Sequence, residues 1–164
     1  MLKYYLSVLI LLLLIGCNKK ESTIGNEYKT TAEQFLRGLY GCNPAVVDEL
    51  ADDSIFVTYP IFQKLFGKPA IRGRDSVKHF AEGFCKRWKD GEITIHSSVA
   101  EGNDVVFVWS FRAINVESVM PDVEPTNSEE SWGGITLFRF NKEGKIIAEI
   151  GEESSPGPFA RSTE

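Results

Sequence analysis

The chain has 164 residues and a formal net charge of −5 at pH 7. This length suits one ordinary domain, and the acidic balance argues against a nucleic-acid partner and against electrostatic docking on anionic lipid. The sequence holds only two histidines and three cysteines, and none of them are clustered. It therefore predicts no dedicated metal site and no cofactor.

The beginning of the chain has the pattern of an export leader that ends in a cysteine. Lys3 supplies a positive charge, residues 6–15 are almost wholly apolar, and Gly16 and Cys17 follow. The apolar run is much shorter than the roughly 20 residues that span a bilayer, as is typical of a signal peptide. Its ending, Leu-Ile-Gly-Cys, resembles the lipobox of bacterial lipoproteins.

That resemblance implies that residues 1–16 are removed and that Cys17 is acylated. The chain would then be held to a lipid bilayer in the cell envelope. Asn18 is not the aspartate that retains lipoproteins at the inner membrane of enteric bacteria, which favours the outer membrane if the host has one. A plain secretory leader and an uncut anchor helix remain alternatives. Residues 17–27 are polar and aperiodic, so we expect a flexible tether.

Three segments have the apolar spacing of helices. They are residues 30–39, residues 45–50, which begin after Pro44, and residues 76–88. Proline suits the first turn of a helix, and Asp75 is placed to cap the third segment.

The other apolar segments favour strands. After Gly91 the apolar period changes to two, which is typical of antiparallel strands. We expect strands at residues 55–59, 93–99, 105–116, 132–140 and 145–153.

The segments between these elements are predicted to be irregular. Residues 60–70 are an apolar loop, and residues 117–130 are a polar loop that contains proline. Residues 154–164 hold two prolines and small polar residues, so we expect a frayed tail.

Helices followed by long antiparallel strands are an α+β plan. The strand at residues 105–116 carries apolar side chains at both parities. Both faces of the sheet therefore need cover. The helices can cover one face, and a cavity or a second copy of the chain, giving a homodimer, can cover the other.

Three stretches resemble the SnoaL-like domains of the nuclear-transport-factor-2-like superfamily. Residues 71–77 are similar to the family's G-R-D helix entry, and residues 99–106, with Trp109 after them, to its G-D-x-V-V hairpin. Residues 135–140 and 144–146 are similar to its final F-R-F and G-K-I segments. These motifs indicate a fold but do not indicate an activity.

The resemblance covers residues 28–153 and implies a strongly curved antiparallel sheet wrapped as a cone around three N-terminal helices. The open end of that cone is a pocket in the family. Its members include cyclases, dehydratases, isomerases, epoxide hydrolases and proteins that only bind a ligand.

Two residues are candidates for acid–base chemistry. Glu149 matches the acidic position after the family's G-K-I segment, but glutamate is seldom buried, so we expect it to face solvent. Glu152 lies at the opposite parity, so only one of the two glutamates can point inward. His96 could act as a base near neutral pH, although a hydrogen-bonded sheet histidine is the simpler interpretation.

Four residues are candidates for ligand binding. Tyr59, Trp109 and Trp132 have the amphipathic rings that line pockets, although each could equally be ordinary core. Arg112 is expected either to be buried against a glutamate or to lie at the pocket mouth, and its parity differs from that of Trp109. No catalytic triad of the family can be matched to the sequence.

Cys42 and Cys85 remain after Cys17 is assigned to lipid. An exported protein can join such cysteines in a disulfide. We slightly prefer two separate buried thiols.

These observations favour a membrane-tethered domain that binds a small, partly apolar molecule in its cone. Two alternatives stay open. One is a proton-transfer enzyme of the cyclase, isomerase or dehydratase type that uses a pocket carboxylate or histidine. The other is a structural or interaction lipoprotein whose cone is filled by side chains. The sequence leaves open whether any reaction is catalysed.

Overall fold

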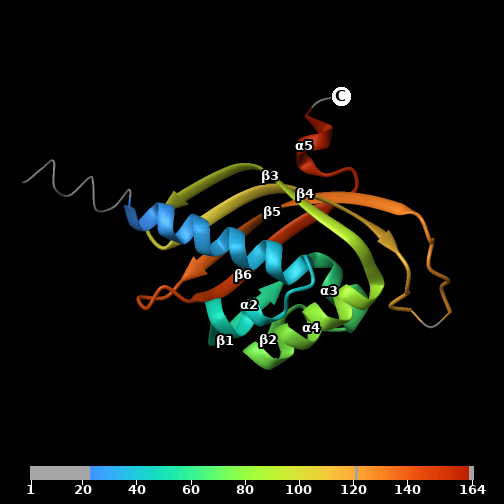
Figure 1. Cartoon of the computed structure of the whole chain (residues 1–164), viewed down its shortest axis with the longest axis horizontal. Coiled ribbons are helices and arrows are strands. Elements are labelled where there is room, and N and C mark those ends of the chain that lie inside the picture. The colour runs from blue at the N-terminus through green and yellow to red at the C-terminus, as the bar shows by residue number, and fades with distance from the viewer. Residues whose placement is uncertain (1–22, 121, 163–164) are drawn as a thin grey trace, which may run out of the picture.

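The computed structural model describes residues 23–120 and 122–162 (Figure 1). The expected signal peptide, Cys17 and most of the expected tether therefore lie outside the described residues. Within the described ranges, no helix combines the length and apolar character that crossing a bilayer requires.

A long N-terminal helix occupies residues 23–40. Its apolar side chains recur at the spacing of one helix face, and all four are fully buried: Ala32, Phe35, Leu36 and Leu39. The prediction of a flexible tether is wrong for residues 23–27, which are helical.

Two short helices follow the N-terminal helix. Helix α2 spans Ala45–Leu50, as expected from Pro44, and strand β1 spans Ala51–Thr58. Helix α3, Pro60–Phe66, replaces the loop expected at residues 60–70. Pro60 begins it with a fixed φ, and Gly67 ends it in the left-handed conformation, with φ 65°.

Helix α4 spans Arg74–Arg87 and follows the two-residue strand β2, Ile71–Arg72. Gly73, with φ 84°, occupies the N-cap position that we expected for Asp75. Asp75 lies in the first turn instead, where a negative charge favours the positive end of the helix dipole.

Four long strands complete the sheet: β3 (Trp88–Glu101), β4 (Asp104–Asn115), β5 (Glu129–Phe140) and β6 (Ile146–Ser154). The sheet has the order β2-β1-β6-β5-β4-β3. Its long strands curve over the helices on one face (Figure 1). This α+β cone confirms the expected fold class.

The sheet is mixed, whereas we expected antiparallel strands throughout. Strand β1 pairs with β6 in parallel, and every other pairing is antiparallel. A parallel pair needs a long crossover between its strands, and α3, α4 and β3 to β5 supply it. The pairing places the end of β1 beside the middle of β6.

The C-terminal segment packs on the sheet, so the prediction of a frayed tail is wrong for its described part. Helix α5 spans Pro158–Arg161 and lies on the face opposite the other helices (Figure 1). Phe159 stacks on His96 with ring centroids 3.7 Å apart, and Gly157 lies directly against Gly133.

Cys42 and Cys85 form a disulfide with Cα atoms 5.3 Å apart. The preference for separate thiols is therefore wrong. Cys42 adopts φ 66° in the turn after the N-terminal helix, and that turn lies against α4. The bridge closes a sequence separation of 43 residues, a constraint on the unfolded chain of roughly 4 kcal/mol.

Candidate ligand pocket

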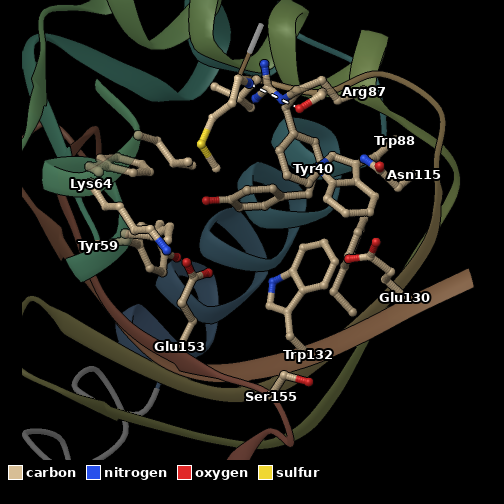
Figure 2. Close-up of a pocket in the computed structure, with 18 of the residues that line it drawn as sticks. Tyr40, Tyr59, Lys64, Arg87, Trp88, Asn115, Glu130, Trp132, Glu153 and Ser155 are labelled. Atoms are coloured by element: carbon tan, nitrogen blue, oxygen red, sulfur yellow. Dashed lines mark hydrogen bonds between the residues drawn. The ribbon is translucent and has the colours of Figure 1, made fainter. Parts of the chain in front are cut away.

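A cavity of about 710 Å³ lies between the helices and the concave face of the sheet. Figure 2 shows its interior, with Tyr40, Tyr59, Trp88, Trp132 and Glu153 around the hollow. Apolar side chains, many of them aromatic, form most of the wall, and the segment after β4 contributes to the rim. The aromatic residues that line it are Tyr40, Tyr59, Phe62, Phe66, Phe80, Phe84, Trp88, Trp109, Phe111 and Trp132.

A buried polar cluster lies beside this cavity. The Tyr59 hydroxyl donates a hydrogen bond of 2.7 Å to Glu149 Oε1, and the Tyr40 hydroxyl donates one of 3.0 Å to the same oxygen. Tyr40 ends the N-terminal helix, Tyr59 follows β1, and Glu149 lies in β6. The carboxylate therefore joins three elements that are distant in sequence.

The hydrogen bonds continue away from Tyr59. Trp109 Nε1 donates to Thr136 Oγ1 at 2.8 Å, and Thr136 Oγ1 lies 2.9 Å from the Tyr59 hydroxyl. Because the Tyr59 proton points to Glu149, the Thr136 hydroxyl donates to Tyr59. The result is a directed chain from Trp109 on β4 to Glu149 on β6.

Glu149 is fully buried, so the expectation that it faces solvent is wrong. Burial raises its pKa to about 7, against the opposing effect of the tyrosine hydrogen bonds. Its Oε2 atom has no hydrogen-bond partner among the described residues. Burial also raises the pKa of Tyr40 and of Tyr59, so both remain hydrogen-bond donors.

Glu153 is the polar residue of the cavity that sequence reasoning missed. It lines the cavity directly, and burial, with a contribution from Glu152, raises its pKa to about 7. Strand parity could have found it, because side chains at even spacings from Glu149 share its face. Glu152 lies at the other parity and is exposed.

A glycine on β6 makes the tyrosine cluster possible. A Cβ at Gly151 would lie 2.0 Å from a carbon of the Tyr59 ring. The ring therefore occupies the place of the missing side chain between Glu149 and Glu153. A similar close approach occurs at Gly134, where a Cβ would lie 2.7 Å from the Trp109 ring.

The structure separates the predicted site residues into two groups. Tyr59, Trp109 and Trp132 line the cavity. His96 and Arg112 lie on the opposite face of the sheet. His96 Nε2 lies 2.9 Å from Ser110 Oγ. That arrangement matches the hydrogen-bonded sheet histidine and rules out a place for His96 in the cavity wall.

Arg112 is exposed and pairs with two carboxylates on neighbouring strands. Its Nε donates to Glu92 at 3.0 Å, and its Nη1 lies 3.4 Å from Glu129. Both expectations are therefore wrong, because Arg112 pairs with glutamates on the exposed face of the sheet and is neither buried nor at the pocket mouth. The sequence indicated this position, because residues 109 and 112 have opposite parity on the same strand and their side chains therefore point to opposite faces of the sheet.

Sequence reasoning also missed Tyr40 and Trp88. Tyr40 closes the apolar stripe of the first helix, and Trp88 lies at the change from helix to strand. Across residues 23–120 and 122–162, no group of three His, Cys, Asp or Glu side chains is arranged to hold a metal ion.

Comparison with known proteins identifies the fold. A family model described as a SnoaL-like domain matches residues 32–149. No curated protein matches the sequence.

Several solved structures share the architecture at low sequence identity. A candidate SnoaL-like polyketide cyclase from Jannaschia sp. CCS1 is 15% identical, with a TM-score of 0.67, covering 85% of this chain and 92% of that one. A candidate polyketide cyclase from Acidithiobacillus ferrooxidans is 19% identical, with a TM-score of 0.65 and coverages of 78% and 88%. An epoxide hydrolase of the LEH-like type from M. tuberculosis is 18% identical, with a TM-score of 0.61 and coverages of 80% and 85%.

The buried carboxyl of Glu149 predicts a specific pH dependence of stability. Its pKa rises from an ordinary 4.5 to about 7 on folding, so the folded state favours the protonated form. The resulting stabilisation is complete below pH 4.5 and is lost as the pH rises through 7. Glu149→Gln should remove this dependence, which is worth up to roughly 3 kcal/mol, while Gln retains an acceptor for the tyrosines.

The measurement is the free energy of unfolding between pH 5 and pH 8 for both proteins. The free energy of unfolding of the wild type should fall relative to that of Glu149→Gln as the pH rises. Glu143→Gln in the exposed turn after β5 is the matched control and should follow the wild type. A constant difference between wild type and Glu149→Gln would contradict the assignment.

Proposed function

The chain belongs to the SnoaL-like family, and from this premise we propose that it is a membrane-tethered domain that binds a small, partly apolar molecule in its cavity. The observation that carries the proposal is the cavity itself. Its volume of about 710 Å³ lies in the range of small-molecule sites. Its wall is mainly apolar and rich in aromatic rings, with polar and charged groups among them, and small-molecule sites are usually of this kind.

The inner end of the cavity supplies the polar groups that would orient a ligand. Glu153 and the hydroxyls of Tyr40 and Tyr59 lie on this side (Figure 2). The hydrogen bonds to Glu149 hold both tyrosines in place. A rigid polar end and an apolar wall together favour a ligand with one polar group on an apolar body.

The second candidate is a proton-transfer enzyme of the cyclase, isomerase or dehydratase type. It is favoured by Glu153, a carboxyl in the cavity wall whose burial raises its pKa to about 7, near the value that suits a general acid or base at neutral pH. Glu149 would act through Tyr40 and Tyr59, since it does not itself line the cavity. His96 has no part in this candidate, and the cavity argues against a filled cone.

Native mass spectrometry of the full-length chain tests the binding proposal. We expect the wild type to carry a copurifying small molecule. Leu65→Trp should lose it because Leu65 lines the cavity and the larger ring would fill part of the volume. Gln63→Trp on the exposed side of the same helix should retain the ligand. Absence of any adduct from all three proteins would contradict the proposal. A ligand that is converted, as a change in chromatographic retention or in mass, on incubation with wild type but not with Glu153→Gln would favour the enzyme.

We propose that Cys17 carries the lipid that tethers the domain. The support is the short leader and the Leu-Ile-Gly-Cys ending, and two or more acyl chains give stable anchoring. Cells fed labelled palmitate should label the wild type and the leader control Ser7→Ala. Cys17→Ala should remain unlabelled because it lacks the thiol, and undiminished labelling of that variant would refute the anchor. An outer-membrane address remains part of this proposal.

We further propose a homodimer through the sheet face opposite the cavity. Apolar side chains of three strands are exposed on that face: Val99 (61%), Ile135 (45%) and Ile150 (40%). A second copy would cover them. Sedimentation should give a dimer for the wild type and for Gln34→Glu on the exposed side of the N-terminal helix. Ile135→Glu should give a monomer because it places a charge in the interface, and a monomeric wild type would refute the proposal.

A further inference from the structure

We propose that the cavity selects an organic cation, meaning an amine or quaternary ammonium group on a partly apolar body, with the cation held among aromatic rings beside Glu153. This inference rests on the proposed ligand-binding function and names the chemical class of the ligand.

Aromatic rings lie close together in the cavity wall. Trp132 lies with its ring centroid 4.9 Å from that of Trp88 and 4.7 Å from that of Phe111. Tyr40 adds a further ring, 5.0 Å from Phe84 and nearly perpendicular to it. The faces of such rings carry negative potential and attract cations, and quaternary ammonium ligands are recognised in this way.

The charged side chains of the cavity wall are mainly acidic. Carboxylates outnumber cations among the residues that line it. The carboxylates are Glu117, Glu124, Glu130 and Glu153, and the cations are Lys64 and Arg87.

Two of the four lining carboxylates already have a partner. Glu117 faces Arg87 and opposes the lowering of the Arg87 pKa by burial. Glu130 accepts a hydrogen bond of 2.7 Å from the Thr126 hydroxyl. These groups lie toward the rim, so they do not neutralise the inner end of the cavity.

Glu153 is different because it is half-buried and its carboxylate makes no hydrogen bond or ion pair with any residue in the described part of the chain. Lys64, whose side chain points toward Glu153 in Figure 2, is exposed, and no ion pair joins these two described residues. Burial raises the pKa of Glu153 to about 7, and Glu152 adds to this. An ionised carboxylate in this position lacks a counter-charge, and a ligand ammonium group would supply one.

A neutral ligand with a hydrogen-bond acceptor is the competing occupant. Trp132 Nε1 points toward the hollow in Figure 2, and it has no hydrogen-bond partner within residues 23–120 and 122–162. Such a ligand would satisfy Trp132 but would leave Glu153 without compensation. The geometry therefore favours the cation, and the experiment separates the two.

Intrinsic fluorescence of the full-length chain gives a direct test. All three tryptophans of the sequence line the cavity, so a ligand that enters it should change their emission. The probes are phenyltrimethylammonium and its neutral counterpart of similar shape, tert-butylbenzene. Titrations use the wild type, Glu153→Gln and the remote control Glu143→Gln. Gln keeps the size of the side chain, and circular dichroism checks that each variant is folded.

We expect Glu153→Gln to weaken phenyltrimethylammonium binding about tenfold and to leave tert-butylbenzene binding within about twofold. Glu143→Gln should match the wild type for both probes. If Glu153→Gln changes the affinity for both probes equally, or if the wild type binds only tert-butylbenzene, the cation proposal is overturned while the proposed ligand-binding function stands. If neither probe changes the emission, the cation proposal and the proposed ligand-binding function both fail.

Discussion

The constraint on which the structure depends is the burial of one carboxyl group. A glutamate inside an apolar core is costly unless hydrogen bonds compensate it. Glu149 receives them from Tyr40 and Tyr59. These donors come from the N-terminal helix and from the end of β1, while Glu149 belongs to the last strand. The requirement to satisfy the carboxyl therefore fixes how the helix, the first strand and the final strand meet.

The same cluster sets the character of the cavity. The tyrosine rings that serve Glu149 also form part of the cavity wall, so a structural requirement and a binding surface use the same side chains. Four residues further along β6, Glu153 lies in the cavity wall itself, and no ion pair among the described residues neutralises its carboxylate. The strand thus presents one carboxyl that accepts hydrogen bonds at Oε1 and one whose side chain has no partner in that part of the chain. This contrast is what gives the pocket a chemical preference beyond apolar volume.

Much of the fold could be predicted because its helices and long strands repeat their apolar residues at clear periods. The errors have physical causes. Residues 60–66 carry too few helical turns for a period to be seen. The short polar tail gains its structure by packing on the sheet, where Phe159 stacks on His96. The disulfide depends on a left-handed turn at Cys42 that no pattern encodes. Glu149 was misjudged because β6 is apolar at both parities, so only the pairing with β1 reveals which face is inside.

One close contact ties two distant positions of the sequence into a single unit. The Tyr59 ring fills the space that any side chain at residue 151 would need. Among natural relatives of this chain, the two positions should therefore covary, with a larger residue at one accompanied by a smaller residue at the other. Such an exchange would conserve the volume but would remove a hydroxyl from the buried carboxyl. Relatives that have lost the glycine should then carry an apolar residue in place of Glu149.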